Sequence, residues 1–139
     1  MKLNQFLREI PLIGLVALAY FLVALAGAEV PARPLLTLGL PSGAAWTFTT
    51  GELLLLVGLA ALYIEIYKAT HTMRSTVLDH ILSLGVFIAC LIGFLLAPAL
   101  GTSTFLLIMV LSLLDVIAGF TVTISSARRD IAYTDERPR

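Results

Sequence analysis

Residues 103–125 read STFLLIMVLSLLDVIAGFTVTIS, and this stretch decides the class of fold. It is almost entirely apolar over the length that an α-helix needs to cross a bilayer, about 20 residues. One carboxylic acid, Asp115, lies near its middle. An acid at the centre of a membrane helix costs roughly 2.5–3.5 kcal/mol on insertion scales, and by default it marks a functional site. Asp115 is therefore the first candidate site residue.

Three further apolar segments, at about residues 10–28, 51–68 and 77–100, have the same character. The chain is 59% hydrophobic and 13% charged, whereas a soluble domain is roughly 45–50% apolar and 25% charged. The segments are rich in Leu, Ala and Ile and lack the alternation of a membrane β-barrel. We therefore predict an all-α integral membrane protein, with four transmembrane helices in an antiparallel bundle that forms a single domain over residues 1–139.

The basic residues predict how these helices are oriented. Arg33 lies in the first connection, whereas the other basic residues lie before the first segment, between the second and third, or after the fourth. By the positive-inside rule both termini are then cytoplasmic, and the location is an inner membrane of bacterial type. The N-terminal pattern also fits a cleavable secretory signal. Because its apolar run is long for a signal, we expect a retained helix.

The connections differ in length. Residues 29–50 form the only sizeable one, an outer loop in which Pro and Gly argue against a long regular element. Its leucines and Trp46 and Phe48 suit a position along the outer surface of the membrane or against the bundle. The segments at 77–100 and 103–125 are joined by almost a tight turn, and residues 126–139 are expected to form a short charged cytoplasmic tail.

Small residues predict how the helices pack. Membrane helices approach one another closely where small side chains line the contact, and such residues recur every four positions in the third segment. The predicted helix-packing residues are Gly85, Ala89, Gly93, Ala97, Gly119 and Gly58. The stripes they belong to would form the bundle interior, which turns both Asp115 and Glu65 inward.

The polar residues concentrate towards the cytoplasmic half of the predicted bundle. The candidate intramembrane polar site comprises Asp115, Glu65, Ser112, His80 and Asp79. Plainer interpretations exist for most of them: Glu65 can pair with Lys68 three residues on, Asp79 can complement the dipole of a helix N-terminus, and His80 can be an interfacial histidine. Glu52, at the outer end of the second segment, has the same dipole explanation as Asp79.

Asp115 has three interpretations. It is a protonated structural acid, hydrogen-bonded to a backbone carbonyl or to Ser112; or it pairs with a basic residue of another subunit; or it handles a proton or cation. The sequence places no Lys or Arg at its depth, so burial alone favours the neutral form.

Several classes of function have no support in the sequence. Cys90 is the only cysteine, so an intrachain disulfide or dithiol relay is excluded. Glu65, His71, Asp79 and His80 are suitable metal ligands by type, but they flank a connection and lack the paired Glu-x-x-His pattern of helical metal sites. Phosphate loops and nucleophile motifs are missing. We predict no enzyme activity, no cofactor and no metal.

The second segment carries a resemblance to a known family. Glu52, the run Leu62-Tyr63-Ile64-Glu65-Ile66-Tyr67-Lys68, a basic connection, two further spans and a basic tail are similar to the phosphate-starvation-inducible PsiE-like proteins. These are small four-helix inner-membrane proteins with an acid in an aromatic setting late in the second helix. The present chain departs in its shorter basic connection and in having Asp115. The resemblance implies the fold and membrane location but no biochemical activity.

Three hypotheses of function remain. The first is a non-enzymatic accessory or assembly subunit of a larger membrane complex, or a homo-oligomer, in which Asp115 meets a partner. The second is a proton or small-cation pathway formed by an oligomer and centred on Asp115, with Glu65 or His80 as the cytoplasmic relay. The third is quinone or lipid binding in the cytoplasmic half, with Tyr63, Tyr67 and His80 at the headgroup. The expected partners are the lipid bilayer and a membrane protein or second copy, and not nucleic acid.

Overall fold

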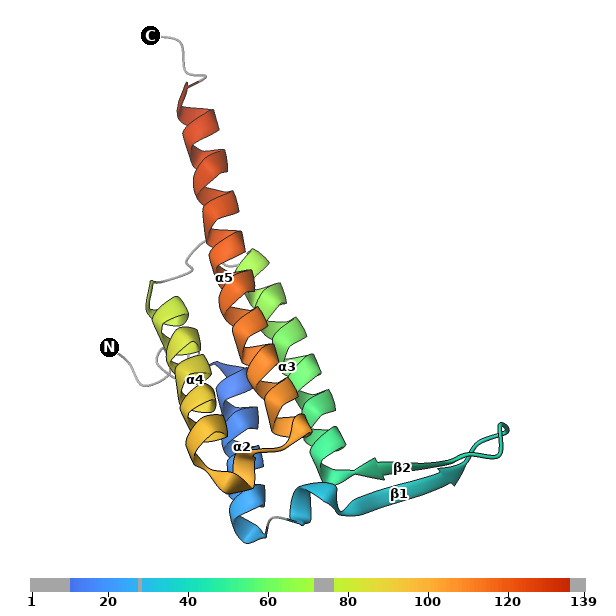
Figure 1. Cartoon of the computed structure of the whole chain (residues 1–139). Helices are drawn as coiled ribbons and strands as arrows, with labels where there is room; N and C mark the ends of the chain where they lie inside the picture. The colour runs from blue at the N-terminus through green and yellow to red at the C-terminus, as the bar shows by residue number, and fades with distance from the viewer. Residues whose placement is uncertain (1–10, 28, 72–76, 136–139) are drawn as a thin grey trace, which may run out of the picture.

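The computed structural model describes residues 11–27, 29–71 and 77–135, with side chains for 11–27, 29–69 and 80–125. Within these ranges four helices pack side by side along roughly one direction (Figure 1), which confirms the prediction of a four-helix protein. They are α2 (Leu12–Ala26), α3 (Thr50–His71), α4 (Val77–Leu96) and α5 (Ser103–Asp135). The first connection holds a short 3-10 helix, η1 (Val30–Ala32), and the strands β1 (Pro34–Gly39) and β2 (Ala45–Thr49); η2 (Pro98–Leu100) joins α4 to α5.

Helix α5 is the centre of the bundle, since it packs against α2, α3 and α4. Its buried residues Phe105 and Ile108 join Tyr20 and Ala24 of α2 in one cluster, and the rings of Tyr20 and Phe105 lie 5.3 Å apart between centroids. A second cluster forms around Ile13, Val16, Ala61, Leu62 and Leu111. The small side chains in both clusters let the helices approach closely.

Most of the apolar helix surface nevertheless faces outward. Two stretches, Thr50–Ala69 and Ser103–Ser125, are long and apolar enough to be possible membrane spans. In the most apolar 18 residues of each stretch, only 22% and 33%, respectively, are buried inside the protein. Helix α2 and the stretch His80–Leu96 are apolar but shorter. The buried core is therefore small and lies between the helices, whose outer surfaces are largely apolar.

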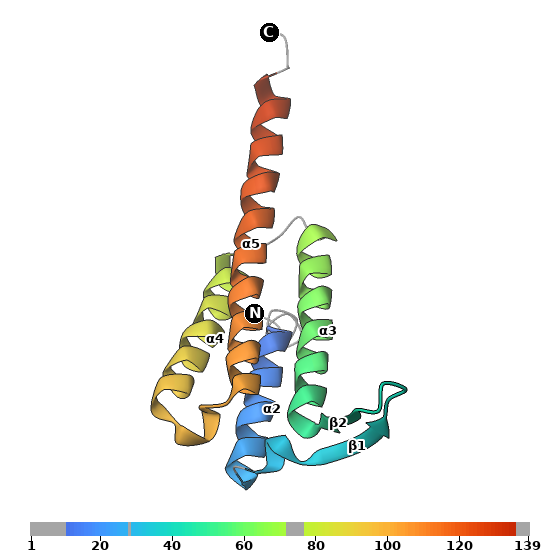
Figure 2. The same cartoon turned by 45° about the vertical axis from the view of Figure 1, so that its right-hand side comes forward.

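The first connection differs from the prediction. Instead of an irregular loop, β1 and β2 pair antiparallel into a hairpin that points away from the bundle, at the end where α2 finishes and α3 begins (Figures 1 and 2). The prolines and glycines taken as evidence against regular structure fit this hairpin: Pro34 begins a strand, Pro41 takes the second place of the turn, and Gly43 has φ +84°. Proline is tolerated at such positions, and glycine adopts positive φ at little cost.

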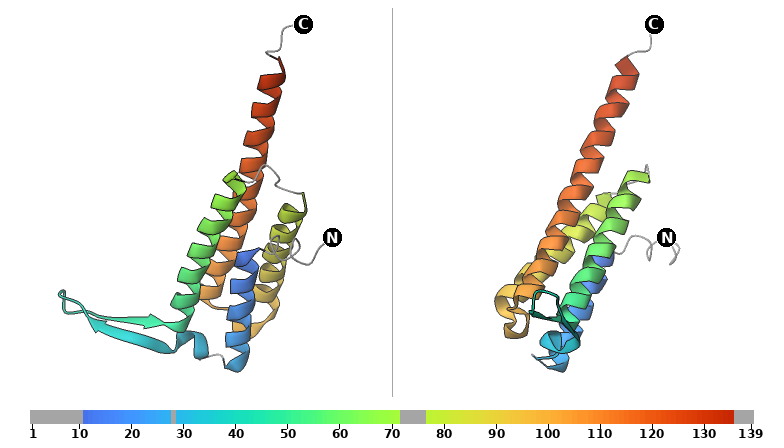
Figure 3. Two further views of the ribbon diagram at one scale, coloured as in Figure 1. Left: turned by 180° about the vertical axis from the view of Figure 1, so that it is seen from behind. Right: turned by 90° about the vertical axis from the view of Figure 1, so that its right-hand side faces the viewer.

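The expected charged tail is also different, because α5 does not end near residue 125 but continues to Asp135. A helix of 33 residues is about 50 Å long at 1.5 Å per residue. Its last turns project beyond the other three helices, at the opposite end from the hairpin (Figure 3). The basic pair Arg128-Arg129 is thus carried on a helix that leaves the bundle.

The predicted packing residues divide into two groups. A methyl group on Gly58, Gly93 or Gly119 would meet a neighbouring side chain at 2.8–3.1 Å, and Ala97 packs partly buried against the core. Gly85, by contrast, faces open space, and Ala89 is exposed. The prediction that the whole stripe of α4 packs inside the bundle is therefore wrong for Gly85, while Ala89 lines a cavity between α2 and α4.

Candidate functional site

Two acids from different helices meet inside the bundle. Glu65 of α3 and Asp115 of α5 lie close enough for their carboxyl groups to interact directly. The sequence predicted that each faces inward, but it did not pair them. They are the only two acids among the described side chains that the structure brings together in this way, and they form the centre of the candidate site.

Asp115 is buried, and its nearest donor comes from α4. The hydroxyl of Ser83 donates a hydrogen bond of 2.7 Å to Asp115 Oδ2. Ser83 is one of the few polar residues within an apolar helix, so its hydroxyl needs a partner, and the carboxyl group supplies one. Ser112 was one of the two partners considered for a protonated Asp115, and its hydroxyl donates to the Met109 carbonyl at 2.7 Å.

Glu65 closes the N-terminal end of α2. That helix begins at Leu12, part-way along the bundle and short of the far end of α3 (Figure 3). The backbone N–H of Leu12 donates to Glu65 Oε1, and the N–H of Ile13 also faces this carboxyl group. Pro11 has no N–H, and the Gly14 N–H donates to the Pro11 carbonyl at 3.0 Å. All donors of the first turn are thereby satisfied, as a helix end in an apolar setting requires.

This capping differs from the predicted local pair with Lys68. The carboxyl group of Glu65 makes its contacts across the bundle, to α2 and to Asp115. A negative group at a helix N-terminus is favoured by the helix dipole as well as by the hydrogen bonds. Oε1 of Glu65 therefore has a structural role, because it caps the N-terminus of α2.

The second oxygen of Glu65 is in a different position. Oε2 is buried, and no donor among the described residues lies within hydrogen-bonding distance, although the Asp115 carboxyl group is adjacent. Two ionised carboxylates cannot satisfy each other, because both are acceptors only. A single proton held between them would give each an appropriate partner, as in other paired-acid sites.

A second polar layer lies nearer the extended end of α5. His80 Nε2 and Thr123 Oγ1 are 2.7 Å apart, and the His80 ring stacks on Phe120 with centroids 5.0 Å apart. The ring fits because Gly119 has no side chain: a Cβ there would lie 2.8 Å from His80 Nδ1. His80 precedes Ser83 by one helical turn, about 4.5 Å along α4, so the histidine layer follows directly upon the acid pair.

Another group of polar contacts lies towards the hairpin end of the bundle. The buried hydroxyl of Tyr20 is 2.6 Å from Thr102 Oγ1, which also accepts from the Phe105 N–H at 3.1 Å. Thr102 precedes Asp115 by 13 positions along the chain, about 20 Å along a helix. Between these two levels Ser112 bonds to its own helix and Cys90 is buried.

The other candidates have separate positions. Asp79 lies on α4, and its side chain is outside the described part of the structure, as is that of His71. Tyr63 and Tyr67 are exposed on α3 and do not point into the bundle. Glu52 forms a capping box at the start of α3, accepting from Thr49 N–H at 2.7 Å while its own N–H donates to Thr49 Oγ1 at 3.3 Å. Over the described residues, no three His, Cys, Asp or Glu side chains converge as metal ligands would.

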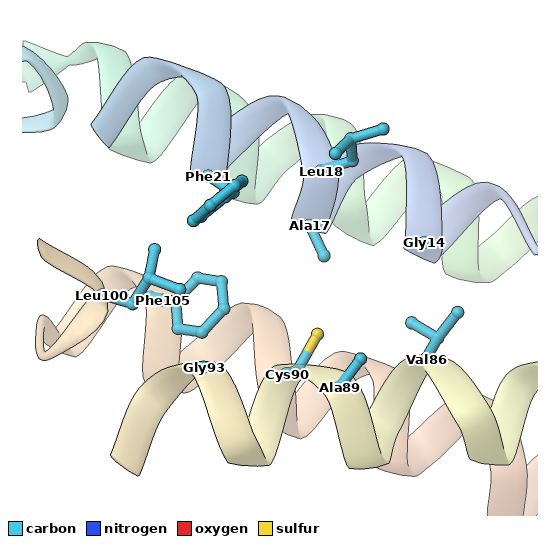
Figure 4. Close-up of a pocket in the computed structure, with 10 residues that line it drawn as sticks. All are labelled: Gly14, Ala17, Leu18, Phe21, Val86, Ala89, Cys90, Gly93, Leu100 and Phe105. Atoms are coloured by element: carbon cyan, nitrogen blue, oxygen red, sulfur yellow. The ribbon is translucent and has the colours of Figure 1, made fainter. Parts of the chain in front are cut away.

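An apolar cavity of about 310 Å³ separates α2 from α4 (Figure 4). Small residues on the two helices, Gly14 and Ala17 facing Ala89 and Gly93, leave this space open. Cys90 also lines it. The cavity contains none of the tyrosines or the histidine that the quinone hypothesis placed at a headgroup, so any ligand here would be bound through apolar contacts alone.

Three features of the site were missed from the sequence: the role of Ser83, the capping of α2 by Glu65, and the Tyr20–Thr102 bond. Ser83 was detectable, because it is a polar residue one turn after His80 within an apolar segment. The other two join residues 53 and 82 positions apart and have no local signal. No family model matches the chain, and neither does any curated protein or solved structure, so the resemblance to the PsiE-like proteins stays a prediction.

Proposed function

We propose that this chain is a non-enzymatic protein of a bacterial-type inner membrane, with four spanning helices and cytoplasmic termini. The outward-facing apolar side chains on all four helices support this arrangement: Leu22 and Leu25 of α2 and Leu95 and Leu96 of α4 are all more than half exposed. Such a surface would be costly in water, at about 25 cal/mol per Å² of apolar area, and is the normal exterior of a helix in lipid. The basic residues at the extended end of α5 give the orientation.

Within that membrane protein, the acid pair of Glu65 and Asp115 binds one proton and is the central site of a proton or small-cation pathway. The observation that carries this proposal is the meeting of all four helices at two adjacent acids, Asp115 buried and Glu65 half-buried. Two unit charges roughly 4 Å apart repel by about 4 kcal/mol at an effective dielectric constant of 20. This repulsion opposes double ionisation and favours one proton retained by the pair.

The polar contacts on either side suggest the route of exchange. His80 and Thr123 form the next polar layer towards the cytoplasmic end, within about 12 Å of Asp115 along α5. Towards the outer end the next described hydrogen bond between two side chains is Tyr20–Thr102, about 20 Å from Asp115. Proton exchange with the cytoplasm is therefore the easier step, and transport across the bilayer needs a further opening, in the cavity between α2 and α4 or between copies of the chain.

The experiment that tests proton binding is infrared spectroscopy of the protein in lipid, since a protonated carboxyl group has its own C=O stretching band. At neutral pH we expect such a band in the wild-type protein and its loss in Asp115→Asn. Glu52→Gln is the matched control, because Glu52 lies in a capping box at the helix end, and it should leave the band unchanged. A wild-type protein without the band at neutral pH would overturn the proposal.

Transport is tested separately in proteoliposomes with a pH-sensitive dye inside. Under an imposed potential, we expect proton or cation flux in the wild type and its loss in Asp115→Asn. Equal flux in both proteins would remove the pathway while leaving the infrared result intact. Proton binding without transport would then describe a proton-sensitive membrane protein.

A second candidate function is an accessory subunit of a membrane complex, or a homo-oligomer. The structure weakens one of its original supports, because Asp115 has a donor within its own chain. A different observation favours it: Gly85 and Ala89 form an exposed small-residue surface on α4, adjacent to the open cavity. Surfaces of this kind accept a neighbouring helix at close range.

Native mass spectrometry of the intact assembly distinguishes this candidate. A stoichiometric foreign subunit, or a homo-oligomer disrupted by Gly85→Leu, would support it. A monomer in both the wild type and Gly85→Leu would contradict it. Leu95→Ala, a change at an outward-facing residue away from the small-residue surface, serves as the control.

A further inference from the structure

The hairpin of β1 and β2 has two chemically different faces. Cross-strand partners lie on the same face and alternate along each strand. Leu36 is paired with Phe48 and Leu38 with Trp46, so these four side chains share one face. The rings of Trp46 and Phe48 lie 5.7 Å apart between centroids, which agrees with this placement.

Leu35, at the register shift between Pro34 and Leu36, is also exposed, but beyond it the opposite face is small and polar. Thr37 is paired with Thr47, and their hydroxyl oxygens are 3.2 Å apart and exposed. Gly39 and Ala45 form the next pair on this face. The hairpin is therefore amphipathic, although it is exposed along most of its length. Its apolar side chains are exposed: Leu36 is 48%, Leu38 45% and Trp46 44% accessible.

A specific turn holds these faces in register. The Gly43 N–H donates to the Leu40 carbonyl at 2.9 Å, and the Leu40 N–H donates to the Ala44 carbonyl at 2.8 Å. With Pro41 at the second position and Gly43 at positive φ, this is a three-residue hairpin loop of a common type. A slip of one residue would exchange the two faces, so the turn fixes which side is apolar.

The direction of the hairpin is the second observation. Its strands run sideways from the bundle, across the helix axes, at the end opposite the extended part of α5 (Figures 1 and 3). If the helices cross the bilayer as proposed above, the hairpin lies at the level of the lipid headgroups and along the membrane plane. Residues 34–49 contain no charged side chain, and Arg33 at the base is exposed and basic.

We propose that the apolar face of the hairpin binds the lipid surface of the outer leaflet, with Arg33 available to lipid phosphates. This face is formed by Leu36, Leu38, Trp46 and Phe48. The side chains of Leu36, Leu38 and Trp46 on this face are exposed, and Trp and Phe are preferred at the level of the headgroups. The threonine face then points to water. This binding rests on the proposed membrane-spanning arrangement and is independent of the acid pair.

Trp46 makes the proposal directly measurable, because it is the only tryptophan in the chain. The full-length protein is reconstituted into phosphatidylcholine vesicles, with or without bromine atoms placed on the acyl chains close to the headgroup. We expect blue-shifted Trp46 emission that the brominated lipid strongly quenches and that aqueous acrylamide quenches weakly. Emission that acrylamide quenches and the brominated lipid does not would overturn the proposal. Protection from both quenchers would also overturn it, since another protein surface would then cover the hairpin.

Paired variants control for misfolding of the hairpin. Leu38→Asp places a charge on the apolar face, and Thr37→Asp places the same charge on the neighbouring strand position of the opposite face. We expect Leu38→Asp to shift the emission to the red and to lose most of the quenching by brominated lipid, while Thr37→Asp retains both wild-type properties. Equal behaviour of the two variants would contradict a one-sided contact with lipid. The infrared band of the acid pair should be the same in both, which separates a failure here from a failure of proton binding.

Discussion

Removal of the Glu65 side chain is the sharpest test of the four-helix junction. In Glu65→Ala the N–H groups of Leu12 and Ile13 lose their acceptor while they remain enclosed by the bundle. A buried donor left without a partner costs about 1–3 kcal/mol, so two donors give a loss of about 2–6 kcal/mol. The contact through the proposed shared proton is lost as well, while Asp115 keeps the hydrogen bond from Ser83, so the expected destabilisation lies within this range.

Glu65→Gln separates capping from charge. The amide oxygen can still accept from the α2 N-terminus, so we expect a smaller loss, about 1 kcal/mol, from the weaker neutral hydrogen bond. Glu52→Ala provides a scale for an ordinary cap, since the loss of an N-terminal capping box costs about 0.5–2 kcal/mol. The predicted order of destabilisation is therefore Glu65→Ala, then Glu52→Ala or Glu65→Gln.

The assay is reversible unfolding in mixed micelles, followed by circular dichroism as the denaturing detergent increases. A double-mutant cycle with Asp115→Asn measures the coupling of the pair. If the two carboxyl groups share a proton, Glu65→Gln and Asp115→Asn will be non-additive, whereas an additive result would show that the acids are independent. A free energy of unfolding for Glu65→Ala within 0.5 kcal/mol of the wild type, the usual range for surface changes, would refute the capping geometry.

Three further substitutions test contacts elsewhere in the bundle. Gly119→Ala should destabilise the protein by about 1–3 kcal/mol, because the added Cβ would press on the His80 ring. Gly85→Ala, in open space, should stabilise the protein by up to about 1 kcal/mol. Equal effects of the two substitutions in unfolding titrations would contradict the described packing. Tyr20→Phe should cost about 0.5–1.5 kcal/mol through loss of the bond to Thr102, whereas Tyr63→Phe on the exposed surface should have no effect on the thermal midpoint. Ser83→Ala should destabilise by about 1–3 kcal/mol and alter the infrared carboxyl band, because Asp115 loses its donor; an unchanged band would argue against that hydrogen bond.

The helical class and the candidate acids were predictable from local pattern. An apolar stretch of sufficient length forms a helix in lipid whatever its neighbours are, because every backbone donor must be satisfied within the segment. Residues such as Asp115 and Glu65 are conspicuous for the same reason, since a carboxyl group in an apolar helix requires an explanation. Composition and spacing carry this information without any long-range contact.

The local pattern was misleading where a residue type has two uses. Proline and glycine between residues 29 and 50 were taken to interrupt regular structure, although Pro41 and Gly43 are also the residues that a hairpin turn requires. Likewise, the small residues of α4 predicted a packed face, but periodicity does not say whether the partner is in the same chain. Gly85 faces open space and Gly93 faces Leu100 from one and the same stripe.

The sequence by itself determined that this protein is built from long apolar helices, that its charges lie at their ends, and that Asp115 and Glu65 are exceptions. These properties depend on the free energy of individual side chains and on the length of one helix. Only the tertiary structure decided that the two acids meet, that Glu65 caps α2, and that Ser83 is the donor to Asp115. Each of these contacts depends on the rotation and depth of one helix relative to another, and those are set by the packing of small and large side chains along the whole seam around α5.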